Sequence, residues 1–170
     1  MLKHEHLLGR EFSWTKDHCY QLVRHFYADN FDIQLRDYAC PHEWWNRGMD
    51  LYGQVYHREG FRVLDCHPRE YRPGDVIMMA YQSPVANHLG VLLDNGKMLH
   101  HMVGSLSSAD PYSAGGFWKS QTVGVLRHKD VNYDPLPQTL DLWSILDPNV
   151  RHDLDQRLST LHPGELPDGL

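Results

Sequence analysis

Three residues in this chain can together do covalent chemistry: Cys19, His88 and His100. A cysteine acts as a nucleophile when a base lies within hydrogen-bond reach of its thiol and a third group orients that base. An imidazole suits the part of the base because its pKa lies near neutral pH. If the fold brings these side chains together, the chain has the groups for nucleophilic catalysis by a cysteine.

Cys19 lies in a segment predicted to be helical. Apolar residues recur at helical spacing from about residue 17 to residue 27, and Thr15 or Asp17 can serve as the N-cap. In the first turn, unpaired backbone N–H groups and the helix dipole stabilise a thiolate, so we expect a lowered thiol pKa. Taken alone, the pattern favours a buried cysteine that packs as a small hydrophobic residue.

The two histidines lie on a predicted β-hairpin over residues 87–101, where two apolar runs flank an Asn-Gly step. A two-residue turn would pair Gly90 with His101 and place His88 on the same face as His101. A three-residue loop would pair Gly90 with His100 instead, making His88 and His100 diagonal neighbours roughly 7–8 Å apart. The residues alone leave both registers open.

The bulk properties limit the class of protein. A length of 170 residues suits one domain, 41% hydrophobic residues is a globular value, and a formal charge of −6 argues against nucleic acid as a partner. We expect a soluble chain without membrane insertion or an export signal, because no apolar segment approaches membrane-spanning length. Without such a signal, a disulfide between Cys40 and Cys66 is not expected.

The remaining elements are predicted from apolar periodicity and from Gly and Pro positions. They are a helix over 42–56, strands at 60–64, 76–81 and 122–127, a loop over 104–116, and a helix over 149–160. Prolines divide residues 130–170 into short pieces, so we interpret them as an appendage that packs on the domain at 1–129 or docks onto a neighbour.

Several motifs in order carry a resemblance to a known family. The chain resembles the NlpC-type, papain-like cell-wall cysteine peptidases, and most of all their branch in bacteriophage tail assembly and tail-tip proteins. The resemblance covers roughly residues 8–129 and rests on segments 17–24, 72–76, 87–93, 96–101, 112–118 and 125–128.

The resemblance implies an α+β fold in which an N-terminal helix carrying the nucleophile packs on a central antiparallel sheet. It implies that Cys19 is the nucleophile, that His88 is the general base and acid, and that His100 orients His88. This assignment selects the register with the three-residue loop.

The resemblance further suggests Trp14, Asp17 and Asn87 as substrate contacts. Relatives carry Asp directly before the cysteine and small residues after it, whereas His18 precedes Cys19 here and Tyr-Gln follows. The long separation between Cys19 and His88 implies an insertion at about residues 30–60.

By resemblance, the expected function is hydrolysis of an amide bond in the peptidoglycan stem peptide, of the γ-D-glutamyl-diamino acid type. The expected partners are that stem peptide and other phage tail-tip or baseplate proteins. The protein would reside in the virion tail, or in the host cytoplasm during assembly, and would act on the periplasmic cell wall. The alternative is a structural tail-tip component with vestigial or assembly-dependent activity.

Metal-dependent hydrolysis is a weaker alternative. Neighbouring histidines and cysteines occur at His4/His6, Cys66/His67 and His100/His101, but none has the spacing of a structural zinc motif and there is no HExxH. We therefore expect no metal and no cofactor.

Overall fold

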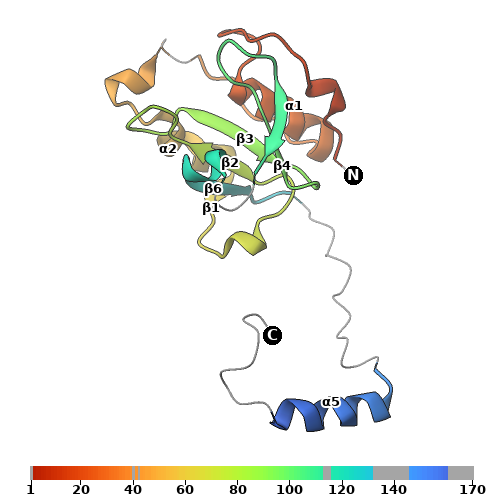
Figure 1. Cartoon of the computed structure of the whole chain (residues 1–170). Helices are drawn as coiled ribbons and strands as arrows, with labels where there is room; N and C mark the ends of the chain where they lie inside the picture. The colour runs from red at the N-terminus through yellow and green to blue at the C-terminus, as the bar shows by residue number, and fades with distance from the viewer. Residues whose placement is uncertain (1, 40, 42, 113–115, 132–145, 161–170) are drawn as a thin grey trace. The chain divides into compact units, whose positions relative to one another are not determined.

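The computed structural model of the chain describes residues 2–39, 41, 43–112, 116–131 and 146–160 (Figure 1). The chain divides into two units, residues 1–132 and 133–170. In the second unit, α5 (Pro148–Thr160) forms close to where a helix was predicted. No helix in the described part of the chain is long and apolar enough to cross a membrane.

An antiparallel sheet forms the centre of the first unit (Figure 1). Among the described residues it has six strands in the order β1-β6-β2-β3-β4-β5. The strands are β1 (Phe61–Val63), β2 (Val76–Met79), β3 (His88–Leu92), β4 (Lys97–His100), β5 (Ser108–Pro111) and β6 (Thr122–His128). The predicted α+β class, with a helix on an antiparallel sheet, is confirmed.

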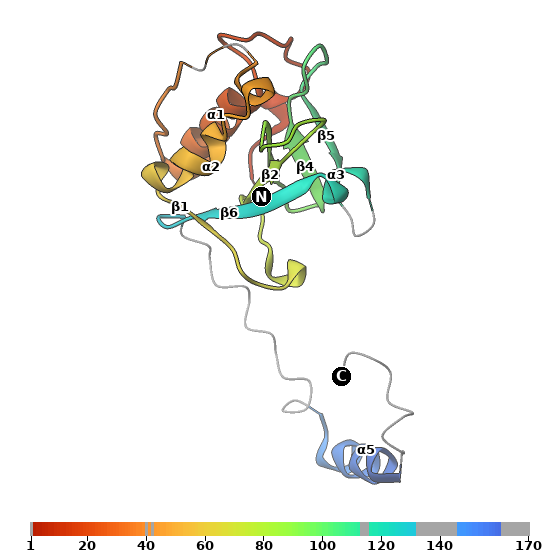
Figure 2. The same ribbon diagram turned by 90° about the vertical axis from the view of Figure 1, so that its left-hand side faces the viewer.

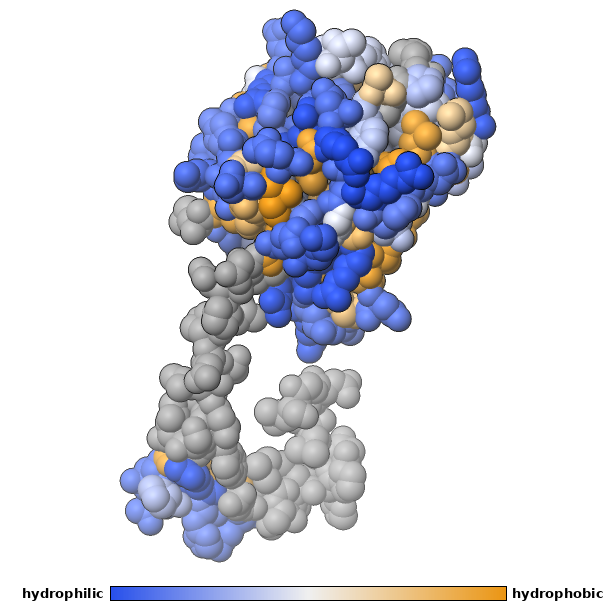
Figure 3. Space-filling model, turned by 180° about the vertical axis from the view of Figure 1, so that it is seen from behind, coloured by the Kyte–Doolittle hydropathy of each residue, from blue (hydrophilic) through white to orange (hydrophobic). Residues whose placement is uncertain are grey.

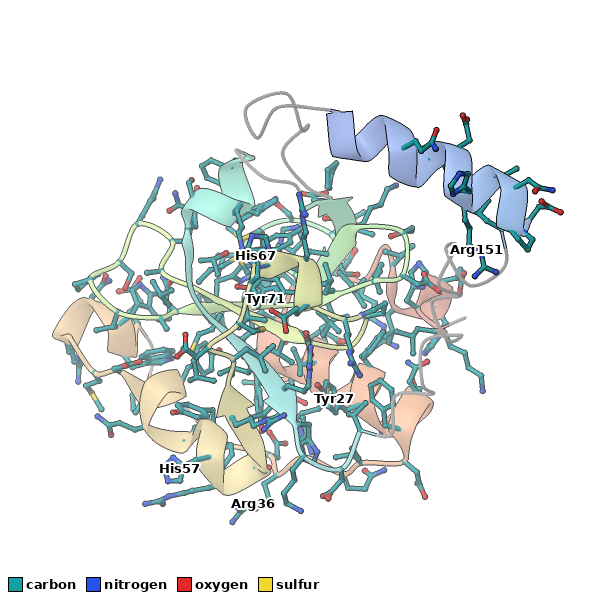
Figure 4. All side chains as sticks on the ribbon, turned by 90° about the horizontal axis from the view of Figure 1, so that it is seen from below. Tyr27, Arg36, His57, His67, Tyr71 and Arg151 are labelled. Atoms are coloured by element: carbon teal, nitrogen blue, oxygen red, sulfur yellow. The ribbon has the colours of Figure 1, made fainter. Side chains whose placement is uncertain are left out.

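Helix α1 (Cys19–Phe31) packs against β3 and β4. Its buried residues include Leu22, Val23, Phe26 and Tyr27, whose spacing of three to four residues makes one apolar face. The Tyr27 hydroxyl donates a hydrogen bond to the Gly74 carbonyl oxygen at 2.7 Å, which ties the helix to the turn before β2. Tyr27, which is labelled in Figure 4, is fully buried.

The start of α1 differs from the prediction. Its N-cap is His18 rather than Thr15 or Asp17, and the His18 side chain makes no capping hydrogen bond. Residues Ser13 and Asp17 instead form an isolated antiparallel bridge, so Asp17 lies outside the capping position. Cys19 is consequently the first residue of the helix.

The single helix predicted over residues 42–56 is wrong. The structure has three short pieces: η2 (Trp44–Arg47), α2 (Leu51–Val55) and η3 (Tyr56–Glu59). Gly48, with a φ of 67°, ends the first piece, and Asp50 begins the second by accepting a hydrogen bond from the Gly53 N–H. Figure 2 shows α2 beside α1, where Tyr52 and Tyr20 have ring centroids 6.4 Å apart.

The β3–β4 hairpin has the register with the three-residue loop. Gly90 pairs with His100, and Gly96 has a φ of 72°, which a glycine adopts without strain. Gly90 is required for packing, because a Cβ at that position would lie 2.5 Å from the Met98 side chain. His88 and His100 therefore share one face of the sheet.

The loop predicted over residues 104–116 is in part a strand, because β5 pairs with β4 at the edge of the sheet. A short helix, α3 (Phe117–Ser120), follows and leads into β6. In Figure 2, α3 lies beside β5.

The Asp75 carboxylate fixes the position of β6. It is fully buried and accepts hydrogen bonds from Arg127 Nε and one terminal nitrogen of Arg127, each at 2.8 Å. Arg127, which belongs to β6, thereby ties this strand to the residue that precedes β2. The outer surface is mostly hydrophilic with hydrophobic patches in the view of Figure 3.

Candidate active site

Cys19 is buried at the start of α1, with 7% of its surface exposed. Burial raises the thiol pKa, and this effect outweighs the Tyr52 hydroxyl, whose oxygen lies 3.4 Å from the sulfur, and the backbone groups of Leu89 and Tyr20. The expectation of a lowered pKa is therefore wrong, because desolvation of the thiolate exceeds the stabilisation from the helix start. The resting group is a neutral thiol.

His88 and His100 form a direct pair. His88 Nε2 lies 3.0 Å from His100 Nδ1, and both rings are buried. Burial, together with smaller effects of the neighbouring His100 and His101, lowers the pKa of His88 to about 3. Burial also lowers the pKa of His100, although the Asp110 carboxylate opposes this change. Both imidazoles are consequently neutral near pH 7.

Cys19 and His88 line a cavity of about 490 Å³. A ligand in this cavity could therefore reach the thiol and the His88 imidazole. A second cavity, of about 670 Å³, is lined in part by His100. The two cavities adjoin, since they share the lining residues Trp45, Tyr81, Asn87, Met102 and Val103. Cys19, His88 and His100 therefore line two adjoining cavities, and concave sites of this kind are where ligands usually bind.

The predicted substrate contacts have different surroundings. Trp14 is 45% exposed, lines the cavity beside Cys19 and stacks on Trp45 with ring centroids 5.9 Å apart. Asn87 lines both cavities, but its side-chain amide binds the backbone N–H and carbonyl of Tyr81 at 2.8 and 2.9 Å. It therefore shapes the wall between the cavities.

Asp17 lies apart from these cavities. Its carboxylate is 3.5 Å from a terminal nitrogen of Arg10, and it is outside the lining of both cavities. The structure thus does not bring Asp17 together with Cys19 and the two histidines in the cleft.

His101 is a buried neighbour of the site, at 1% exposure, and it lines the cavity beside Cys19. Burial lowers its pKa, and the nearby backbone groups of Ser105 and Arg10 oppose this effect. The backbone groups of Ser105 and Arg10 make no hydrogen bond of normal geometry with His101, because both of its ring nitrogens are without a partner among the described residues. The ring packs edge-on against Phe12 at a centroid distance of 5.4 Å.

Three residues at the site were missed by the sequence analysis: Tyr52, Asp110 and Trp118. Tyr52 approaches the Cys19 sulfur from α2. Asp110 Oδ2 lies 3.1 Å from His100 Nε2 and accepts a hydrogen bond from Trp118 Nε1 at 3.2 Å. No local pattern marks Asp110, because it comes to lie beside His100 only through the pairing of β5 with β4.

No group of three or more His, Cys, Asp or Glu side chains within the described residues could hold a metal ion. Cys40 lies outside the described residues, and so does the candidate disulfide with Cys66.

The chain is similar in sequence to two phage proteins that share one name. The chain is 35% identical over 127 residues to "Tail tip assembly protein K" of Escherichia phage N15, covering 74% of this chain and 50% of that protein. It is 30% identical over 124 residues to the protein of the same name in Escherichia phage lambda, covering 73% of this chain and 60% of that protein. The chain thus spans between half and three fifths of these relatives.

Among solved structures, an NlpC/P60 family protein from Bacillus cereus matches with a TM-score of 0.48 and 15% identity, covering 72% of this chain and 36% of that one. A lipoprotein-like member of the NLP/P60 family from Staphylococcus aureus matches with a TM-score of 0.47 and 17% identity, covering 72% and 38%. The model of the NlpC/P60 family itself matches residues 9–127. The chain therefore belongs to the NlpC/P60 family.

Proposed function

We propose that this chain is a phage tail-associated cysteine peptidase that hydrolyses an amide bond in the peptidoglycan stem peptide. The bond is of the γ-D-glutamyl-diamino acid type. The observation that carries the proposal is the 3.0 Å contact between His88 and His100 beside the cavity that holds Cys19. This pairing supports the assignment of Cys19 as nucleophile, His88 as base and His100 as the group that orients the base.

The reaction begins with neutral partners. His88 Nε2 faces His100, which leaves Nδ1 of His88 to take the Cys19 proton as the sulfur attacks the scissile carbonyl. The carbonyl oxygen becomes an oxyanion, and backbone N–H groups at the start of α1 stabilise it. When the C–N bond breaks, the imidazolium of His88 protonates the departing amine and a thioester remains on Cys19.

Water completes the cycle. His88, neutral again, removes a proton from a water molecule that attacks the thioester. The C–S bond breaks, the acid product leaves, and the proton returns to the Cys19 sulfur. His100 exchanges no atom in either half; it holds the imidazole of His88 in position.

The names of the two phage relatives support a biological setting for this activity. Both phage relatives are named as tail tip assembly proteins. We infer that this chain works in the tail tip, joins it during assembly in the host cytoplasm, and opens the periplasmic cell wall as DNA enters. Its partners would be other tail-tip or baseplate proteins.

A structural tail component with assembly-dependent activity is the second candidate. The raised pKa of the Cys19 thiol favours it, because a buried neutral thiol reacts slowly until a ligand or partner changes its surroundings.

Mass spectrometry of stem peptides from purified peptidoglycan tests the proposal. The unaltered protein, Cys19→Ala and the control Cys66→Ala are compared, since Cys66 lies outside both cavities. We expect one new amine and one new carboxyl terminus with the unaltered protein and with Cys66→Ala, and none with Cys19→Ala. If neither the folded chain nor tails containing it give a Cys19-dependent product, the structural candidate is correct.

A further inference from the structure

We propose that Asp110 is a positioning residue of this site: it fixes which nitrogens of His100 and His88 carry protons, so that the bare nitrogen of His88 is the one available to Cys19. Its catalytic consequence rests on the proposed function. The proton arrangement itself does not, and it can be measured without substrate.

The first support is a row of side chains across three adjacent strands. Gly90 of β3 pairs with His100 of β4, and His100 pairs with Ser108 of β5. His88 and Asp110 each lie two residues from one of these partners, so both share the face of His100. The distances along the row are 3.0 Å from His88 to His100 and 3.1 Å from His100 to Asp110.

The second support is the order of donors and acceptors along this row. A carboxylate only accepts hydrogen bonds, so the His100 Nε2 atom facing Asp110 must carry a proton. A neutral His100 then has a bare Nδ1, which accepts the proton on His88 Nε2. A neutral His88 therefore has a bare Nδ1, and this is the atom that a general base needs.

The third support is the way Asp110 is held. Trp118 Nε1, a donor only, gives its hydrogen bond to the same Oδ2 atom of Asp110. The Trp118 ring also packs edge-on against His100 with centroids 4.6 Å apart. Burial raises the pKa of Asp110, but the hydrogen bonds from His100 and Trp118 outweigh it and hold this pKa below its usual value. The carboxylate is thus charged at neutral pH.

Without Asp110, the donor-to-acceptor direction of the hydrogen bonds along this row is no longer fixed. The Ser108 hydroxyl lies 3.4 Å from His100 Nε2 and can either donate or accept. A donating Ser108 would favour a bare Nε2 on His100, a proton on its Nδ1, and a proton on His88 Nδ1. In that state His88 cannot accept the thiol proton.

Nuclear magnetic resonance of nitrogen-15 histidine-labelled protein at neutral pH reads these protons directly. We expect His88 and His100 each to carry the proton on Nε2, with the His100 proton shifted downfield by its bond to a carboxylate. Asp110→Asn keeps the size and an acceptor oxygen, and should retain the pattern with a smaller downfield shift. Asp110→Ala should lose the shift. A proton on Nδ1 of His100 in the unaltered protein would overturn the proposal.

Alkylation of Cys19 by iodoacetamide, followed by mass spectrometry of the Cys19 peptide, supplies a functional measurement without substrate. We expect Asp110→Ala to slow the reaction at pH 7 by ~10–100-fold, as loss of an outer orienting group does elsewhere. Asp110→Asn should slow it less. The matched control Asp94→Asn removes an exposed carboxylate from the β3–β4 loop and should leave the rate unchanged.

The outcomes separate the two proposals. Equal alkylation rates and an unchanged His100 proton in folded Asp110→Asn and Asp110→Ala would overturn the role of Asp110, whatever the peptidoglycan assay gives. Failure of peptidoglycan cleavage together with the expected proton pattern would instead overturn the proposed function alone. If Asp110→Ala does not fold, Asp110→Asn and the unaltered protein still decide the question.

Discussion

His100 Nδ1 lies 3.0 Å from His88 Nε2 with both rings buried, so the orientation of one imidazole is set by the other. A side chain that acts in this way should contribute to the rate of the chemical step more than to substrate affinity. Removal of His100 is therefore expected to lower kcat while leaving KM nearly unchanged.

We predict that His100→Ala lowers kcat for stem-peptide cleavage roughly 100-fold or more with little change in KM, because His88 loses its orienting partner. Steady-state kinetics on a synthetic stem peptide measures both constants. His100→Gln, which keeps a polar group in reach of His88, should recover part of kcat. A large rise in KM with unchanged kcat would instead indicate a substrate contact.

We predict that Tyr52→Phe slows alkylation of Cys19 at a fixed pH by roughly two- to tenfold, the range that one lost hydrogen bond gives. The Tyr52 hydroxyl lowers the pKa of the Cys19 thiol, so its removal raises that pKa and leaves less thiolate. Tyr56→Phe, on the neighbouring η3, is the control and should behave like the unaltered protein. Faster alkylation of Tyr52→Phe would contradict the contact.

We predict that acid destabilises the fold. The folded pKa of His88 is about 3, below the ordinary value of 6.5, so between these pH values the unfolded chain binds more protons. Stability is fully present above pH 6.5 and is lost as the pH falls toward 3, at about 1.4 kcal/mol per pH unit for one such histidine. Urea unfolding at pH 7, 6, 5 and 4 measures the slope.

The control for this acid effect is His88→Gln, which cannot titrate. Its urea midpoint should depend less on pH than that of the unaltered protein. An identical slope in both proteins would assign the acid sensitivity to other groups, such as His18 or His128, whose pKa values burial also lowers.

We predict that Gly90→Ala destabilises the protein by ~1–3 kcal/mol, because its Cβ would lie 2.5 Å from the fully buried Met98 side chain. Thermal or urea unfolding measures the loss. Gly124→Ala is the matched control, since its Cβ would meet only the terminal methyl of Met78, at 3.1 Å. In a Met98→Ala background, Gly90→Ala should cost less, and an unchanged cost would exclude this clash.

Local patterns were enough to predict the elements that carry Cys19 and the two histidines. The apolar face of α1 has helical spacing, and the Asn-Gly step marks the β3–β4 hairpin. The choice between the two registers needed more than the local pattern. A one-residue slip leaves that pattern intact while it pairs Gly90 with His101 instead of His100.

The missed features depend on contacts between distant segments. β5 reads Ser-Ala-Asp-Pro, which has low strand propensity, and it is a strand because β4 offers an unpaired edge. Asp110 is therefore beside His100 through sheet pairing that no local signal specifies. The thiol pKa was missed for a related reason: the depth of burial of Cys19 depends on segments such as α2 that pack over it.

Burial of the Cys19 thiol also affects how the protein ages. Oxidation to the sulfenic acid proceeds through the thiolate, so a sulfur that is kept protonated and out of water reacts slowly with peroxide and oxygen. In the tail-tip setting proposed above, such a sulfur would stay reduced in aerated surroundings without any enzyme to repair it. The burial that makes Cys19 a slow nucleophile at rest would therefore also protect its thiol from oxidation.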